Sequence, residues 1–190
     1  TGRSTPLTFE DSDDDAAAEA STRRYGQADG LPPQFGSLTP ASDGTTLYFM
    51  GGSASEPGGV YQWAIPPAGT PPAPADASAG PEVAAKMLAC SSSQRLPDGY
   101  VSVPSLVEFP TTLGTAFAYY YAPTNAEFES ADEAAPPLLV KAHGGPTGAT
   151  SGAFNPAIQF WTSRGFAVLD VDYGGSTGYG REYRRRLCGA

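Results

Sequence analysis

The chain has 190 residues, 40% of them hydrophobic, and it contains 23 glycines and 19 prolines. This size allows one medium domain or parts of two, and so much glycine and proline indicates loop-rich segments beside a folded portion. The formal net charge of −9 at pH 7 argues against nucleic acid or an anionic membrane as a partner. No run of residues is long and apolar enough to indicate a membrane span.

The two cysteines, Cys90 and Cys188, are too few for a disulfide framework and fall in different predicted domains. We therefore expect both to be reduced, which favours a cytoplasmic or organellar-lumen location over secretion. No signal peptide is recognised, although the sequence opens on Thr1 rather than Met. The oligomeric state is not predicted.

Residues 1–34 mix charge, Ala, Gly and Pro without a period of 2 or 3.6, which predicts an acidic, disordered segment. Its acidic run, residues 10–15, lacks the glycine and distal glutamate of a calcium loop, so we expect no metal site there. Residues 66–81 form a second low-complexity stretch, rich in Pro and Ala, with no means of building a core.

Residues 35–99 otherwise favour β-structure. The runs 45–50 and 60–65 are rich in β-formers, and Asp43-Gly44 before the first is typical of a tight turn. Together they predict a β-hairpin, which needs a packing partner to persist in water. Residues 82–90 are expected to return the chain as a short strand or a helix.

Residues 100–190 predict an α/β fold. Strands are expected at 105–109, where Pro110 should stop the first, and at 116–121, 138–142 and 166–171. Residues 111–115 are expected to be a hairpin connection and residues 123–137 a polar surface loop. Helical spacing covers 156–164, and a further helix is expected from residue 178. This order predicts an antiparallel start and a right-handed parallel continuation, with functional loops at the carboxyl ends of the parallel strands.

Each of the two expected parallel strands runs directly into a glycine cluster. The first cluster reads His143-Gly144-Gly145-Pro146. The second reads Asp172-Tyr173-Gly174-Gly175-Ser176-Thr177-Gly178-Tyr179-Gly180-Arg181, and residues 161–166 between them read Trp-Thr-Ser-Arg-Gly-Phe. This combination, over roughly residues 102–187, resembles the prolyl oligopeptidase family, in particular its dipeptidyl-peptidase-like and acylaminoacyl-peptidase-like serine peptidases.

The resemblance implies that residues 100–190 are the first half of an α/β-hydrolase sheet and that residues 35–99 belong to a β-propeller blade. It implies a peptide substrate and no cofactor. In such hydrolases the loop after the third strand gives an N–H donor to the oxyanion of acyl transfer. By resemblance we assign that donor to Gly145, with Gly144 as second choice. Support of the loop or pocket is assigned to His143, Pro146, Tyr173 and Tyr179.

His143 is the only histidine, yet we do not expect it to be the catalytic base. The catalytic histidine of an α/β-hydrolase follows the nucleophile in the chain, and His143 precedes any possible nucleophile. We expect its ring to brace the loop through a hydrogen bond. Asp170 and Asp172, two apart on one strand face, are expected to be loop-anchoring acceptors rather than metal ligands.

The one Gly-x-Ser-x-Gly match in the sequence, residues 174–178, lacks the strand-to-helix context of a nucleophile elbow, so we expect none of the Ser/Asp/His triad in this chain. The predicted function is a fragment of a serine peptidase that cleaves short peptides through an acyl-enzyme, inactive by itself. Two alternatives remain open: a carboxylesterase or lipase fragment, whose loop commonly reads His-Gly-Gly-Gly, and a non-catalytic truncated binding module. In the hydrolase arrangement residues 138–142 should form an unpaired, apolar sheet edge.

Overall fold

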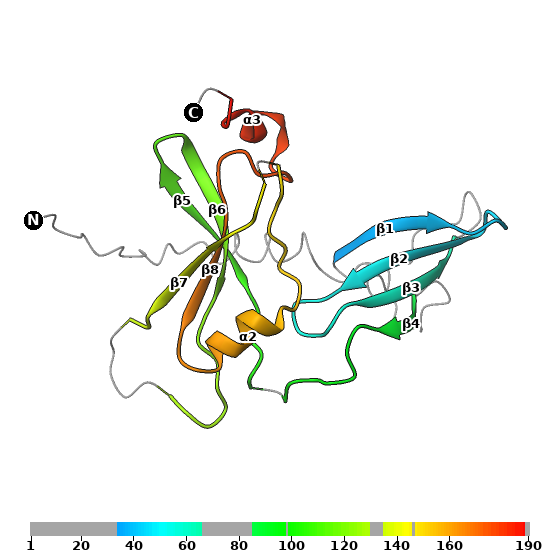
Figure 1. Ribbon diagram of the computed structural model, residues 1–190, viewed down its shortest axis with the longest axis horizontal. Coiled ribbons are helices and arrows are strands. Elements are labelled where there is room, and N and C mark those ends of the chain that lie inside the picture. Colours follow the sequence, from blue (N-terminus) through cyan, green and yellow to red (C-terminus); the bar gives the residue numbers. More distant parts are fainter. Residues whose placement is uncertain (1–33, 66–84, 98, 130–134, 146, 189–190) are drawn as a thin grey trace, which may run out of the picture.

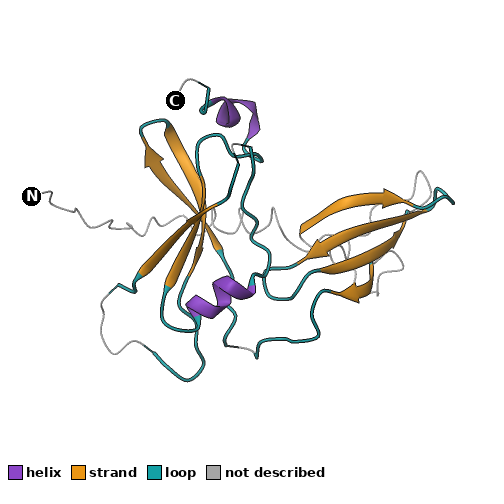
Figure 2. Ribbon diagram, in the orientation of Figure 1, coloured by secondary structure: helices purple, strands orange, loops and turns teal. Residues whose placement is uncertain are grey.

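The computed structural model describes residues 34–65, 85–97, 99–129, 135–145 and 147–188. These residues form two four-stranded sheets, and Figures 1 and 2 show helix α2 in the region between them. The predictions for residues 1–33, for the insertion at 66–81 and for Pro146 lie outside the described residues.

The first sheet is an antiparallel meander in chain order. Its strands are β1 (Gln34–Pro40), β2 (Thr46–Gly52), β3 (Gly59–Ala64) and β4 (Lys86–Cys90). The expected hairpin is the β2–β3 pair, and β4 settles the strand-or-helix alternative in favour of a strand. Sequence reasoning did not identify β1 as a strand, because its side chains are mostly exposed and its register shifts between Gly36 and Thr39.

The β1–β2 turn follows from its sequence. Gly44 has φ +70, a conformation that glycine adopts without strain. The Asp43 carboxylate accepts hydrogen bonds from the amides of Thr45 (2.8 Å) and Thr46 (3.0 Å). These bonds, chiefly the one from Thr45, favour the charged form and lower the pKa of Asp43.

The second sheet has the order β5-β6-β8-β7, with β5 (Ser105–Thr111), β6 (Gly114–Tyr121), β7 (Leu138–Ala142) and β8 (Ala167–Asp172). The β5–β6 and β6–β8 pairs are antiparallel, whereas β7 and β8 are parallel. One prediction was wrong: Pro110 does not stop the first strand but lies inside β5, opposite Thr115. Because β5 is an edge strand, its outer side tolerates a residue without an N–H. The hairpin turn is accordingly shorter than predicted, at residues 112–113.

Helix α2 (Pro156–Thr162) connects the two parallel strands. Asn155 caps it by accepting a 3.0 Å bond from the amide of Ala157, and Pro156 occupies the first turn, where its missing N–H costs nothing. The helix is shorter than the predicted 156–164 and is followed by Gly165 at φ +86. Ile158 of α2 packs with Tyr119, Tyr121 and Val168 in the core of this sheet.

Strand β7 forms an open edge, as predicted. Among the described residues it pairs only with β8. Two apolar side chains on β7 are unusually accessible, Val140 at 66% and Leu138 at 48% exposure. The last element is α3 (Gly180–Arg185), which lies beyond the carboxyl end of β8 (Figure 1). No helix in the described ranges has the length and apolarity that crossing a membrane requires.

Candidate functional site

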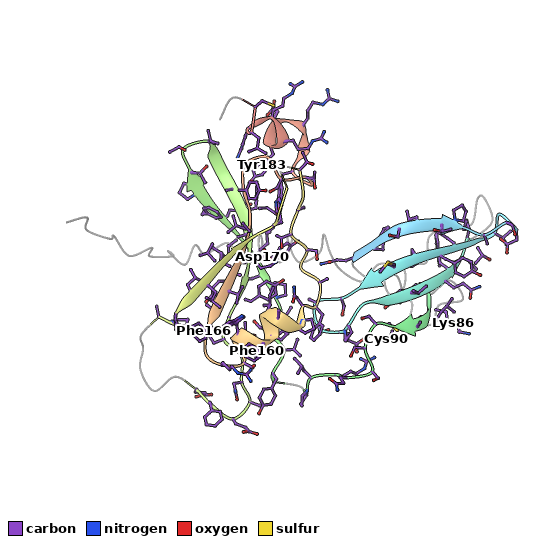
Figure 3. All side chains as sticks on the ribbon, in the orientation of Figure 1. Lys86, Cys90, Phe160, Phe166, Asp170 and Tyr183 are labelled. Atoms are coloured by element: carbon purple, nitrogen blue, oxygen red, sulfur yellow. The ribbon has the colours of Figure 1, made fainter. Side chains whose placement is uncertain are left out.

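The two glycine clusters meet because β7 and β8 are parallel and in register. Ala142 pairs with Val171. His143, the residue after β7, and Asp172, the last residue of β8, therefore lie at the same end of the sheet, where the two parallel strands finish. One step back, Lys141 pairs with Asp170, and its amine lies 2.5 Å from the buried carboxylate (Asp170 is labelled in Figure 3). This ion pair joins the two strands directly below the loops that carry the candidate site.

The His143 side chain is almost fully enclosed by the two loops, with 9% exposure. Its Nε2 lies 2.7 Å from Ser176 Oγ and its Nδ1 lies 3.2 Å from the carbonyl oxygen of Gly144. Its ring stacks on Tyr173, with ring centroids 4.5 Å apart. If Nδ1–H donates to Gly144, Nε2 accepts the Ser176 hydroxyl proton. These are the contacts of a side chain that braces the loop.

His143, Ser176 and Asp172 come together in space but do not have the geometry of a catalytic triad. In a triad the serine and the carboxylate bind opposite nitrogens of the imidazole ring. Here both face Nε2, Ser176 at 2.7 Å and Asp172 Oδ1 at 3.7 Å. Ser176 is also fully buried, at 0% exposure, so its hydroxyl cannot meet a substrate. The three side chains thus have the contacts of a hydrogen-bonded structural cluster.

Asp172 joins three segments of the site. Its Oδ1 accepts a 2.7 Å bond from the amide of Thr150, and its Oδ2 accepts a 2.8 Å bond from the Tyr179 hydroxyl. Its main-chain carbonyl accepts a 2.5 Å bond from the hydroxyl of Tyr183 on α3. Asp172 is 1% exposed, and a buried carboxylate needs such donors to offset its lost hydration. Asp172 therefore fixes the first loop, the second loop and α3 relative to β8.

Gly144 and Gly145 lie at the exposed tip of the first loop. Gly145 has φ +74, which favours glycine, and its carbonyl accepts a 2.5 Å bond from the Tyr173 hydroxyl. A Cβ at Gly144 would meet nothing within 4 Å. Within the described part of the chain neither amide donates a hydrogen bond to another residue. The loop thus presents two backbone N–H groups to solvent while its carbonyls are held from below.

The far side of this loop is pinned by Gly148. Its carbonyl accepts a 2.8 Å bond from the amide of Thr177 and a 3.3 Å bond from the Thr177 hydroxyl. A Cβ on Gly148 would lie 2.7 Å from His143 Nδ1 and 3.1 Å from the Gly144 carbonyl oxygen. Only glycine therefore allows this close approach of the loop to the histidine ring.

Tyr179 supports the second loop by packing inward. Its ring stacks on Phe117 with centroids 4.3 Å apart and lies 4.9 Å from the ring of Tyr183. Burial raises the pKa of Tyr183, which keeps its hydroxyl protonated as the donor to Asp172. The aromatic group thus anchors the start of α3 (Tyr183 is labelled in Figure 3).

Sequence reasoning placed His143, Tyr173 and the two aspartates but missed Ser176, Thr150 and Tyr183. Ser176 is the centre of the Gly-x-Ser-x-Gly match at residues 174–178, and it lies against the histidine ring, a contact that the pattern does not predict. The partners of these residues are remote in the chain, so no local spacing could indicate them. No group of three or more His, Cys, Asp or Glu side chains in the described ranges is placed to hold a metal ion.

The known proteins to which this chain is similar include several peptidases. No family model matches the chain. Dipeptidyl aminopeptidase BIII of Pseudoxanthomonas mexicana is 37% identical over 71 residues, which are 36% of this chain and 10% of that protein. The solved structure of a Mycobacterium tuberculosis puromycin-hydrolyzing peptidase matches with a TM-score of 0.63 at 34% identity, over 76% of this chain and 20% of that one.

A serine-to-alanine mutant of puromycin hydrolase, complexed with PGG, matches with a TM-score of 0.65 at 28% identity. That match covers 84% of this chain and 22% of the hydrolase. The chain therefore spans between 10% and 22% of the length of these three relatives.

Proposed function

The chain belongs to the prolyl oligopeptidase family, and we propose on that basis that it is part of a serine peptidase that hydrolyses short peptides through an acyl-enzyme. In this proposal the second sheet is the first half of the α/β-hydrolase domain and the first sheet is part of a propeller blade. A short peptide as substrate agrees with the PGG bound to the puromycin hydrolase mutant.

The observation that carries the proposal is the Gly144–Gly145 loop at the carboxyl end of β7. Acyl transfer places negative charge on the former carbonyl oxygen, and catalysis needs N–H donors already aimed at it. Both amides lie on an exposed tip, and Tyr173, bonded to the Gly145 carbonyl, limits the movement of the loop. The assignment of the donor to Gly145 rather than Gly144 follows the resemblance, and the φ of +74 at Gly145 explains why glycine is needed there. Removal of one such donor typically slows acyl transfer by about 100- to 1000-fold.

We assign no catalytic triad residue to this chain. The only histidine bonds to a buried serine and faces its nearest carboxylate through the same nitrogen, so it has no free, correctly oriented base nitrogen. The open edge of β7, with Val140 exposed at 66%, is a place where a further parallel strand of a hydrolase sheet would pair. In the proposal that strand and the residues after it supply the nucleophile, acid and base.

A fluorophosphonate probe tests this assignment on the 190-residue chain. The probe reacts with activated serines, so we expect no covalent labelling by mass spectrometry. Labelled peptides containing Ser176 would show that the His143 cluster is a nucleophilic site and would refute the assignment. A longer polypeptide that contains this chain together with a second Gly-x-Ser-x-Gly, on a strand-to-helix turn, should be labelled at that second serine, and the label should be lost when this serine is changed to alanine.

The peptidase and esterase alternatives are separated by substrate preference of that longer polypeptide. The sequence of the second cluster, residues 172–181, favours the peptidases, as does proline rather than a third glycine at position 146. We therefore expect a higher kcat/KM for peptide anilides than for p-nitrophenyl esters. The reverse order would favour the esterase. Absence of labelling and of both activities in a folded protein would favour a binding module.

A further inference from the structure

A cavity of about 670 Å³ lies between the first sheet and helix α2. Its walls come from three separate segments: the end of the β2–β3 loop, the linker after β4, and α2 with its flanking residues. No residue of either glycine cluster lines it. The volume is within the range of about 300–1,000 Å³ that is usual for small-molecule sites.

The walls of this cavity are held in place by hydrogen bonds between the segments. Gln159 of α2, 1% exposed, accepts a 2.7 Å bond from the amide of Ser102 in the linker and donates a 3.0 Å bond to its carbonyl. The amide of Phe154 donates a 2.7 Å bond to the carbonyl of Ser53 at the start of the β2–β3 loop. A cavity whose walls are already ordered loses little conformational entropy when a ligand binds.

The charge of the cavity comes from two arginines on different segments. Arg95 of the linker forms an ion pair with Glu56. Arg164, just beyond the end of α2, has no carboxylate within 4.0 Å among the described residues. Its Nη1 donates instead to two neutral oxygens, the Phe160 carbonyl at 3.0 Å and Ser163 Oγ at 3.3 Å. A guanidinium with no carboxylate partner in the described ranges thus lies in the wall of a cavity, on a protein with net charge −9.

The rest of the lining is suited to an apolar body. The guanidinium carbon of Arg164 lies 3.8 Å from the centre of the Phe160 ring, a contact that restricts the side chain (Phe160 is labelled on α2 in Figure 3). Leu96, Phe154 and Pro156 add apolar surface, and Tyr100 and Gln94 add polar groups. A planar guanidinium held in this way can bind a carboxylate through two parallel N–H···O bonds.

We propose that the cavity between the first sheet and α2 is a binding site for a small organic carboxylate with an aromatic or aliphatic body, held by Arg164. Phe160 and the apolar lining would contact the body, while Arg95 lies available as a second cation once its pairing with Glu56 is relaxed. The proposal does not depend on peptidase activity, because binding can be measured on this chain without turnover.

The test is a titration of the 190-residue chain with hippurate, followed by ¹H–¹⁵N NMR shifts of Gln94, Ser92 and Ser163. Hippuramide is the matched probe, since it keeps the benzoyl body and replaces the carboxylate by an amide. We expect saturable shifts with hippurate and at least about tenfold weaker binding of hippuramide, because charge-assisted bonds are about twice as strong as neutral ones. Equal shifts from both probes, or none at millimolar concentration, would overturn the proposal.

Substitutions in and outside the cavity test which residue binds the carboxylate of hippurate. Arg164→Gln should weaken hippurate binding by about tenfold, and Arg184→Gln on α3, the same change of charge outside the cavity lining, should leave it unchanged. Glu56→Gln, which frees Arg95, should strengthen it. Equal affinity of wild type and Arg164→Gln would refute the role of Arg164, provided that both unfold at the same urea concentration. If Arg164→Gln unfolds, Arg164→Lys replaces it, with a smaller loss expected. Inorganic phosphate that binds as tightly as hippurate would refute the carboxylate class.

Discussion

Gly148→Ala is the substitution that most directly tests how the candidate oxyanion loop is supported. The added Cβ would lie 2.7 Å from His143 Nδ1, whereas ordinary contacts begin near 3.4 Å, so about 0.7 Å of movement is required. Gly148 itself cannot easily retreat, because its carbonyl is bonded to the Thr177 amide at 2.8 Å. The histidine ring must move instead, and the 2.7 Å bond to Ser176 would stretch to as much as about 3.4 Å, where a hydrogen bond is weak.

The size of the effect follows from these contacts. Loss of one buried hydrogen bond, with Ser176 left unpaired, costs about 1–3 kcal/mol. Alanine also lowers the conformational entropy of the unfolded chain, which offsets about 0.4–1 kcal/mol of this loss in stability. We therefore expect Gly148→Ala to lower the free energy of unfolding by about 1–2 kcal/mol in urea titrations. The amide resonances of Gly144 and Gly145 should shift as well.

Gly144→Ala is the matched control, since its Cβ meets nothing within 4 Å and its φ is not in the left-handed region. It should be as stable as the wild type or more stable by up to about 1 kcal/mol, because the alanine restricts the unfolded chain without straining the folded one. If Gly148→Ala is as stable as Gly144→Ala and leaves the Gly145 resonance in place, the histidine ring does not brace the loop as argued.

Three further substitutions test other parts of the site and the sheet. Asp172→Asn keeps the shape of the side chain but weakens two charge-assisted hydrogen bonds, so the free energy of unfolding should fall by about 2 kcal/mol. Asp43→Asn, the same change in an exposed turn, should lower it less. Equal losses would contradict the anchoring role of Asp172. Burial, with the nearby charge of Asp170, raises the pKa of Tyr121 to about 12, so its stabilising contribution is complete below pH 10 and is lost as the pH rises toward 12. Tyr121→Phe should therefore flatten the fall in unfolding free energy between pH 10 and 12, and an unchanged slope would count against it. Val140→Lys should reduce self-association in sedimentation velocity without changing stability, because lysine on an open edge opposes strand pairing, and undiminished association would show that β7 is not the contact.

Local sequence was sufficient where neighbouring residues decide the structure. The Asp43-Gly44 turn, the β2–β3 hairpin and the strands that flank α2 follow from turn chemistry and from runs of β-forming residues. The two glycine clusters also followed from sequence, and their combination carried the resemblance to the prolyl oligopeptidase family. Such features depend on residues within a few positions of each other.

Pro110 and β1 show where local rules fail. Proline stops a strand only if its N–H is needed, and whether β5 has a neighbour on both sides is a property of the whole sheet. Likewise β1 has no alternating apolar pattern, and it is a strand because its backbone pairs with the free side of β2.

The sequence by itself determined which residues border the candidate site, since His143 and Asp172 each end a strand run. Only the tertiary structure decided what they do. The parallel pairing of β7 with β8 places Ser176 against the His143 ring and directs Thr150 and Tyr179 to Asp172. These partners are 7 to 33 residues apart in the chain, and a buried polar group is satisfied by whichever donor the fold brings within 3 Å rather than by its sequence neighbours.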